Sequence, residues 1–319
     1  MIKAGIIGAG GISSSYMSAA ENLSGIEITC MADLVAEKVE KFVEKYGIKS
    51  YREYGKMIDA EKLDAVIIAL PHSLHRDVVI DCCKRKLHVL VEKPMAVSSS
   101  ECEEMIAAAK AQGIKLMVGH IQRYFPENRK AKEIIQSGEL GKLTMIVDIR
   151  NNDYFTAERP QWFFNPRVSG GGIFMNYGAH SLDKIMWLTD SKVKNISGKI
   201  GYHAEGMPVE GNAQVMVELE NGITAVVSQC GYKGDVRNET QLYMTKGTLT
   251  LCTGKGLYMD RGKGYEEVFV RQDGKAFERQ LTSFIKSIEE DREPEITGQY
   301  GKDIISAIEK VYCCTNQGI

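Results

Sequence analysis

The chain has 319 residues, of which 44% are hydrophobic, and its 40 Lys+Arg nearly balance its 42 Asp+Glu. That length favours two domains over one. The charged residues form no concentrated basic run of the kind that binds nucleic acid, so we expect no nucleic-acid partner.

No segment is apolar enough over its length to span a bilayer, and the first residues lack the pattern of a secretory signal. The eight cysteines lie mostly in apolar surroundings, without the spacing of a zinc site. We therefore expect reduced core cysteines, a cytoplasmic location, no membrane contact and no metal.

Apolar runs alternate with helical segments through the first 120 residues. The expected strands are Ile2–Ile7, Glu27–Ala32, Ala65–Leu70, His88–Val91 and Lys115–Gly119. The expected helices are Ile12–Leu23, Val35–Tyr46, Tyr54–Ile58, Leu74–Arg85, and one from the capping box Ser98/Glu101 to Gly113. This alternation predicts an α/β domain with a doubly wound parallel sheet over residues 1–120.

From residue 121 to 319 the pattern changes to period-two strands. They are expected at Thr144–Ile149, Val193–Tyr202, Ala213–Leu219, Ile223–Cys230, Glu239–Met244 and Val268–Arg271, with a hairpin turn at Asn221-Gly222. Helices are expected at Asn128–Ser137, Ala179–Leu188, Leu281–Glu290 and Lys302–Thr315. The pattern predicts an α+β domain with a large, mostly antiparallel open sheet. Because an exposed half-apolar sheet is a liability, we expect a homodimer or homotetramer.

A glycine-rich turn, Gly8-Ala9-Gly10-Gly11-Ile12-Ser13, joins the first strand to the first helix. Such a turn lets a pyrophosphate approach the backbone and the helix N-terminus, which points to a dinucleotide-binding (Rossmann) domain. Asp33 ends the second strand, where a carboxylate binds the adenine-ribose hydroxyls and repels a 2′-phosphate. This favours NAD over NADP. The alternative is a plain glycine turn with a helix-capping Asp33.

Two further strands end in polar residues at the carboxyl edge, where ligands of such sheets bind. One is followed by Leu70-Pro71-His72-Ser73-Leu74-His75 and the other by Glu92-Lys93-Pro94. Leu70, His72, His75, Glu92 and Lys93 are candidate cofactor contacts. The two histidines could equally be structural, and Lys93 could be a surface lysine before a turn.

A later stretch, Gly170-Gly171-Gly172-Ile173-Phe174-Met175-Asn176-Tyr177-Gly178-Ala179-His180-Ser181-Leu182-Asp183, completes a specific combination with Glu92-Lys93-Pro94. With these motifs the chain resembles the Gfo/Idh/MocA family nearly from end to end. The resemblance also covers Asp33, Pro71–His75, Arg123–Pro126, Trp162 and Lys246-Gly247-Thr248-Leu249. The last of these segments is predicted to form a turn.

The resemblance implies that Lys93 contacts a substrate hydroxyl and relays protons, and that His180 is the general base or acid. The position of Asn176 carries an aspartate in the inositol dehydrogenase branch, so an inositol substrate is less well supported. An amide orients a ring or hydroxyl by hydrogen bonding but does not stabilise an imidazolium. Asp183 is a possible substitute partner for His180, and a capping role or a pairing with Lys184 is the favoured alternative.

The expected activity is hydride transfer between NAD and a secondary alcohol or ketone of a sugar or polyol, with Asp33, Lys93 and His180 converging on one cleft. Arg123, Tyr154, Trp162, Asn176 and His180 are candidate substrate contacts, although packing explains Tyr154 and Trp162 equally well. Rival interpretations are redox-neutral glycoside cleavage with NAD, a non-catalytic sugar or NAD sensor, and an aldehyde or imine reductase. Retention of both Lys93 and His180 argues against a sensor.

Overall fold

The computed structural model describes residues 1–316, with the side chains of residues 1–314. It divides into two compact units. The first holds Met1–Gly119 together with Phe277–Lys302, and the second holds His120–Ala276 and the chain from Asp303 onward. Helix α9 (Ala276–Glu289) and the first turn of α10 (Gly298–Asn316) therefore pack with the N-terminal part of the chain.

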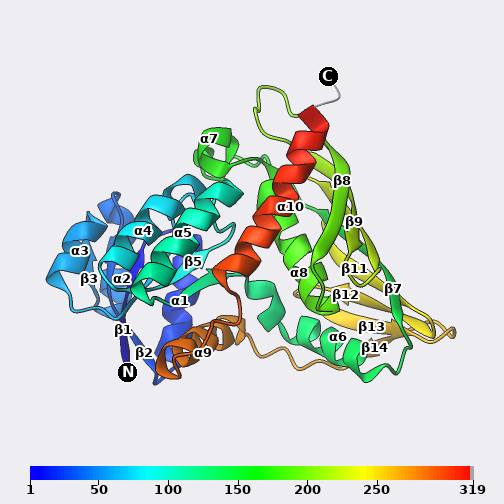
Figure 1. Cartoon of the computed structure of the whole chain (residues 1–319), viewed down its shortest axis with the longest axis horizontal. Coiled ribbons are helices and arrows are strands. Elements are labelled where there is room, and N and C mark those ends of the chain that lie inside the picture. The colour runs from blue at the N-terminus through cyan, green and yellow to red at the C-terminus, as the bar shows by residue number, and fades with distance from the viewer. Residues whose placement is uncertain (317–319) are drawn as a thin grey trace. The chain divides into compact units, whose positions relative to one another are not determined.

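The first unit is built on a six-stranded sheet in the order β3-β2-β1-β4-β5-β6. All five strand pairs are parallel. The strands are β1 (Ile2–Ile7), β2 (Ile26–Ala32), β3 (Lys49–Tyr51), β4 (Ala65–Ile68), β5 (His88–Glu92) and β6 (Leu116–Gly119). The connecting helices are α1 (Gly11–Glu21), α2 (Ala36–Tyr46), α3 (Tyr54–Ala60), α4 (His75–Lys84) and α5 (Ser99–Gln112), of which α4 and α5 lie side by side (Figure 1). The predicted doubly wound parallel sheet is confirmed.

The strand order reverses between β1 and β4, and the chain leaves both strands at the same edge. A Cβ on Gly8 would lie 2.3 Å from the carbonyl oxygen of Ala69, and Gly8 has φ +102°. Only glycine allows the two strand ends to approach this closely. A crevice for a ligand is expected at such a reversal point.

The second unit is built on an eight-stranded sheet in the order β14-β13-β12-β11-β7-β10-β9-β8. Every pair is antiparallel except β7 with β10, so the predicted mostly antiparallel sheet is confirmed. The strands are β7 (Leu143–Asn151), β8 (Val193–Gly201), β9 (Asn212–Leu219), β10 (Thr224–Cys230), β11 (Arg237–Met244), β12 (Gly247–Cys252), β13 (Gly256–Asp260) and β14 (Tyr265–Val268). Helices α6 (Pro126–Ser137) and α8 (Ala179–Thr189) lie on one side of this sheet (Figure 1).

The predicted hairpin at Asn221-Gly222 joins β9 to β10, with Gly222 at φ +84°. Two other predictions in this region are wrong. Residues 247–249, expected in a turn, open strand β12, and the last strand is Tyr265–Val268 rather than Val268–Arg271. The carboxylate of Asp260 accepts hydrogen bonds from the backbone of Gly262, Lys263 and Gly264, which sets the β13–β14 turn and hence the register. Pairing, rather than the apolar run 268–270, decides where this edge strand lies.

The eight cysteines all lie among the described residues, and none of them forms a disulfide. Four of them are buried in the first unit, as the core prediction requires, whereas Cys313 and Cys314 are exposed on α10, so the core prediction is wrong for that pair. Within residues 1–316, no helix combines the length and the apolar character that crossing a bilayer would need.

The segment before α8 is shaped by one buried carboxylate. Glu210 accepts hydrogen bonds from the backbone N–H of Gly172 (2.7 Å) and Phe174 (3.0 Å) and from the hydroxyl of Tyr312 (2.6 Å). These bonds fix the start of η4 (Phe174–Gly178), a π-helical turn that continues directly into α8. Gly172 lies so close that its Cβ would meet the carbonyl oxygen of Glu210 at 2.2 Å.

Gly172→Ala is therefore expected to destabilise the protein by about 2–4 kcal/mol, because neither the methyl group nor the backbone of Glu210 has room to move. Thermal or urea unfolding measures this. Gly234→Ala is the matched control, since an added Cβ there meets nothing within 4 Å. Equal stabilities of the two variants would show that the packing at Gly172 is not a constraint.

Candidate functional site

The glycine turn and Asp33 form one hydrogen-bonded unit at the carboxyl edge of the parallel sheet. The carboxylate of Asp33 accepts from the backbone N–H of Ala9 (2.8 Å) and of Val35 (2.9 Å). Ser13 folds back over the turn, with its hydroxyl donating to the carbonyl of Gly8 (2.7 Å). Each Asp33 oxygen keeps a further lone pair, so the carboxylate remains able to accept from ribose hydroxyls.

The N-terminus of α1 fits a pyrophosphate. Its N-cap is Gly10, with no side-chain cap, and its first turn contains no acidic residue. A Cβ on Gly11 would meet nothing within 4 Å, and the nearest atom to one on Gly10 is 3.9 Å away. The backbone is thus open at the position where helix N–H groups bind anions. Ile12 and Leu34, 37% and 72% exposed, provide apolar surface beside it.

His75 ties together the two loops that follow β4 and β5. Its ring is buried, with Nε2 2.9 Å from the carbonyl oxygen of Leu70 and Nδ1 3.1 Å from that of Pro94. Burial lowers the pKa of His75, although the backbone carbonyls partly oppose this. This environment favours the structural alternative for His75. Its role as a cofactor contact, like those of Leu70 and the buried His72, stays a prediction.

Glu92, at the end of β5, also serves the local structure. It accepts from the hydroxyl of Tyr16 (2.6 Å) and from the backbone N–H of Lys93 (3.1 Å). The Tyr16 oxygen also lies 3.1 Å from the amide of Gln280 on α9. Burial raises the pKa of Glu92, and the bond from Tyr16 counteracts this rise. The backbone of Lys93 is thereby held through its neighbour, and the Lys93–Pro94 peptide bond is cis.

In the second unit, η4 and α8 carry Asn176, Tyr177 and His180 on one continuous helix. Asn176 and His180 are 5% and 8% exposed. The single π-helical turn was not predicted from the sequence. Such turns occur frequently at functional sites. The signal that could have indicated it is a pair of glycines, Gly172 before the turn and Gly178 at its end, where an added Cβ would clash with Glu210 and Phe174 respectively.

Asp183 does not pair with Lys184, so that prediction is wrong. Its carboxylate accepts from the guanidinium of Arg123 (2.8 Å), and its second oxygen lies 4.0 Å from Nδ1 of His120. Successive helical residues point in different directions. Lys184 accordingly reaches the sheet, where it pairs with Asp148 at 3.1 Å. Arg123 is 5% exposed, and its proposed substrate contact stays a prediction.

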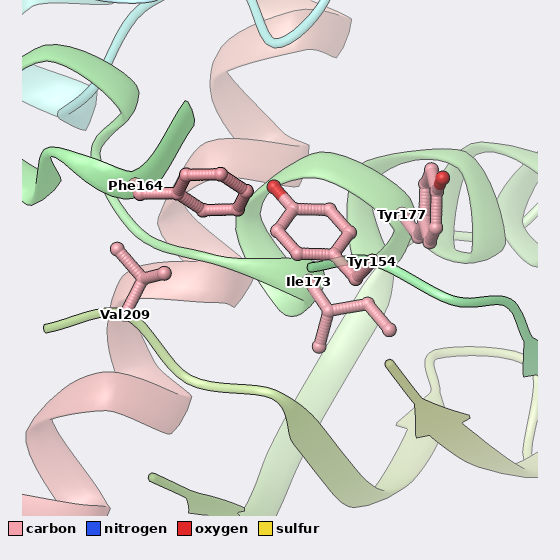
Figure 2. Close-up of a cluster of buried hydrophobic side chains, with 5 residues drawn as sticks. All are labelled: Tyr154, Phe164, Ile173, Tyr177 and Val209. Atoms are coloured by element: carbon pink, nitrogen blue, oxygen red, sulfur yellow. The ribbon is translucent and has the colours of Figure 1, made fainter. Parts of the chain in front are cut away.

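Tyr154 lies in a buried aromatic cluster with Phe164, Ile173, Tyr177 and Val209. Figure 2 shows its ring between Phe164 and Tyr177, and it meets both edge-on, at centroid distances of 6.3 and 5.6 Å. Burial raises the pKa of Tyr154, whereas Arg159 and the amide of Asn176 lower it. Trp162 stacks on Phe163 at 3.7 Å. Packing therefore accounts for both residues, and a substrate role for either stays a prediction.

The fold, the residues at the carboxyl edge of the parallel sheet and the residues on η4 and α8 together define a dinucleotide-binding oxidoreductase. Residues 2–120 match the model "Oxidoreductase family, NAD-binding Rossmann fold", and residues 128–250 match "GFO/IDH/MocA C-terminal domain". The chain belongs to the Gfo/Idh/MocA family, and it is an NAD-binding oxidoreductase.

Three similar proteins illustrate the relationship. The rhizopine catabolism protein MocA of Rhizobium meliloti is 30% identical over 71% of this chain and 70% of its own length. The myo-inositol 2-dehydrogenase of Thermotoga maritima is 27% identical over 94% of this chain and 92% of its own. The aldose-aldose oxidoreductase of Caulobacter crescentus, solved with glycerol, has a TM-score of 0.91 at 25% identity and covers 100% of this chain and 98% of its own.

The burial of His75 predicts that the stability of the protein depends on pH. Because its pKa is lower in the folded protein, the unfolded chain binds the proton more readily, and stability falls as the pH drops below about 6.5. His75→Gln should lose less stability than the wild type between pH 7.5 and 5, measured by urea unfolding. His203→Gln, at an exposed histidine, should follow the wild type. Parallel pH profiles for the wild type and His75→Gln would contradict the prediction.

Proposed function

We propose that the protein transfers a hydride between NAD and a secondary alcohol or ketone of a sugar, polyol or sugar derivative. The observation that carries the proposal is the helix η4–α8, whose start is held by Glu210 and which presents Asn176 and His180 one turn apart. The names of the relatives, which include an inositol dehydrogenase and an aldose-aldose oxidoreductase, support a polyhydroxy substrate.

NAD, when bound, supplies the hydride acceptor or donor. In this proposal His180 takes the hydroxyl proton during oxidation and returns it during reduction, and Lys93 contacts a substrate hydroxyl and relays protons, the roles that the family resemblance implies. Asn176 orients the imidazole or the substrate through hydrogen bonds and adds no charge. The glycine turn and Asp33 are proposed to hold the cofactor, and the carboxylate favours NAD over NADP.

His180→Ala tests the general base. Removing a positioned acid–base group should lower kcat/KM by roughly 10²–10⁴-fold. Reaction is followed as absorbance at 340 nm against pooled polyols, sugars and sugar acids, and then against the active component. His203→Ala is the control because His203 is exposed. A change within a factor of a few in His180→Ala would show that another group takes the proton.

A flat 340 nm trace from folded, NAD-binding protein would contradict net hydride transfer. The same preparation mixed with chromogenic glycosides distinguishes the rival: release of the chromophore without NADH would identify redox-neutral glycoside cleavage.

Asp33→Asn tests the cofactor preference. The amide oxygen keeps one of the two backbone hydrogen bonds that the carboxylate accepts, and the charge that repels a 2′-phosphate is removed. The ratio of kcat/KM with NAD to that with NADP should therefore fall about 10–100-fold. Asp64→Asn is the control, because Asp64 also accepts from a backbone N–H, that of Lys3, just before β4 begins. An unchanged ratio would mean that Asp33 does not determine the preference for NAD over NADP.

A further inference from the structure

Two arginines flank Tyr177 in the second unit without a carboxylate between them. Arg150, near the end of β7, places its guanidinium carbon 4.0 Å from the centre of the Tyr177 ring. Arg159, in the loop that follows, places its own 5.9 Å from the same ring centre. Among the residues that the structure describes, no Asp or Glu oxygen lies within ion-pair distance of either guanidinium.

The hydrogen bonds at this place leave donors in excess. The Nε–H of Arg159 donates to the carbonyl of Tyr154 (2.6 Å), and one N–H of its Nη2 donates to the hydroxyl oxygen of Tyr177 (3.1 Å). Its Nη1 donates to no described residue. Arg150 makes no hydrogen bond through its side chain to any described residue, so all five of its N–H groups remain to be used.

Tyr177 adds a further donor. Its hydroxyl oxygen accepts from Nδ2 of Asn152 (2.9 Å) as well as from Arg159, so both of its lone pairs are occupied. Its own proton must then point to another acceptor, and none is found within the described part of the chain. Tyr177 is only 8% exposed, so little solvent is available to replace that acceptor.

Neighbouring carboxylates are committed elsewhere. Asp148, two residues before Arg150 on the same face of β7, pairs with Lys184 and accepts from Thr240. The carboxylate of Glu210 accepts hydrogen bonds from Gly172, Phe174 and Tyr312. Burial and the like charge of Arg159 both lower the pKa of Arg150, and Asp148 and Tyr177 partly offset this. Arg150 and Arg159 are both partly exposed, so their surplus donors are open to a ligand. Two positive charges favour a ligand that brings negative charge and several acceptor oxygens.

We propose that Arg150, Arg159 and the hydroxyl of Tyr177 bind the carboxylate of an acidic sugar substrate, such as a uronate or aldonate. The proposal rests on the proposed function, since it names the class of substrate for the same site on η4 and α8. Tyr177 precedes His180 by three residues, less than one turn of the same continuous helix. A carboxylate at Tyr177 and a reacting hydroxyl at His180 are therefore compatible with one sugar.

The test measures binding by calorimetry, with the full chain saturated with NAD. The probes are D-glucuronate, D-galacturonate and D-gluconate, each compared with its neutral counterpart, D-glucose, D-galactose or D-glucitol. At least one acid should bind 10-fold or more tightly than its counterpart. Arg150→Gln should weaken that acid roughly 10–100-fold and leave the neutral compound unchanged.

Arg237→Gln is the matched control, since Arg237 is an exposed arginine of the neighbouring strand β11 and pairs with Asp235. Tyr177→Phe keeps the ring and removes the proton, and should weaken the acid roughly 2–10-fold, which keeps the test decisive if Arg150→Gln fails to fold. Neutral sugars binding as tightly as their acids, no acid binding below about 10 mM, or a preference that survives both substitutions would overturn the proposal.

The same samples separate the two proposals at 340 nm. An acid that binds through Arg150 without forming NADH would count against hydride transfer and leave the carboxylate site standing. NADH formed only from neutral sugars would support hydride transfer and contradict the carboxylate site.

Discussion

The buried carboxylate of Glu210 is the interaction on which the second unit's candidate site depends. It is 1% exposed, and burial raises its pKa, so it would be costly without partners. Two backbone N–H groups and the Tyr312 hydroxyl offset that cost. The bonds define where η4 begins, and with it the positions of Asn176, Tyr177 and His180. A residue distant in sequence from the glycine-rich stretch thus sets the geometry of that stretch.

The first unit uses a carboxylate in a related way. Asp33 accepts from Ala9 in the glycine turn and from Val35 before α2, so it joins two loops at the carboxyl edge. One side chain therefore shapes the turn and carries the charge expected to select the cofactor. Because the same oxygens have lone pairs left over, structural and binding roles do not compete at Asp33. His75 differs, since both of its ring nitrogens face backbone carbonyls.

The parallel sheet was predictable because strands buried on both faces are short continuous apolar runs separated by amphipathic helices. β3 was missed because its three residues carry no such pattern, and they pair only at the sheet edge. The extent of β12 and β14 depended on pairing across the sheet, which local sequence does not report. Residues 277–302 pack with the first unit through tertiary contacts, such as that of Gln280 with Tyr16.

The candidate site was predictable where a motif names residues, and unpredictable where partners come from elsewhere in the chain. Asp33 and the glycine turn lie together as their spacing indicates. The pairing of Asp183 with Arg123 joins residues 60 positions apart, and neither belongs to a local motif with the other. Arg150 and Arg159 carry no such signal in the sequence, because an arginine at a strand end or in a loop is ordinary unless the structure shows that no carboxylate pairs with it.

The proposed carboxylate site also bears on Asn176. The family resemblance implies an aspartate at the position of Asn176 in the inositol dehydrogenase branch, whereas this chain has a neutral amide there, which adds no negative charge beside His180. A substrate carboxylate held at Arg150 and Tyr177 would bring a negative charge to the same helix. That charge would be present only when substrate is bound, and it would stabilise an imidazolium formed at His180 as the hydroxyl proton is taken. Under the proposed carboxylate site, the neutral amide at position 176 and the surplus of cationic donors have one explanation, a substrate that carries its own anion.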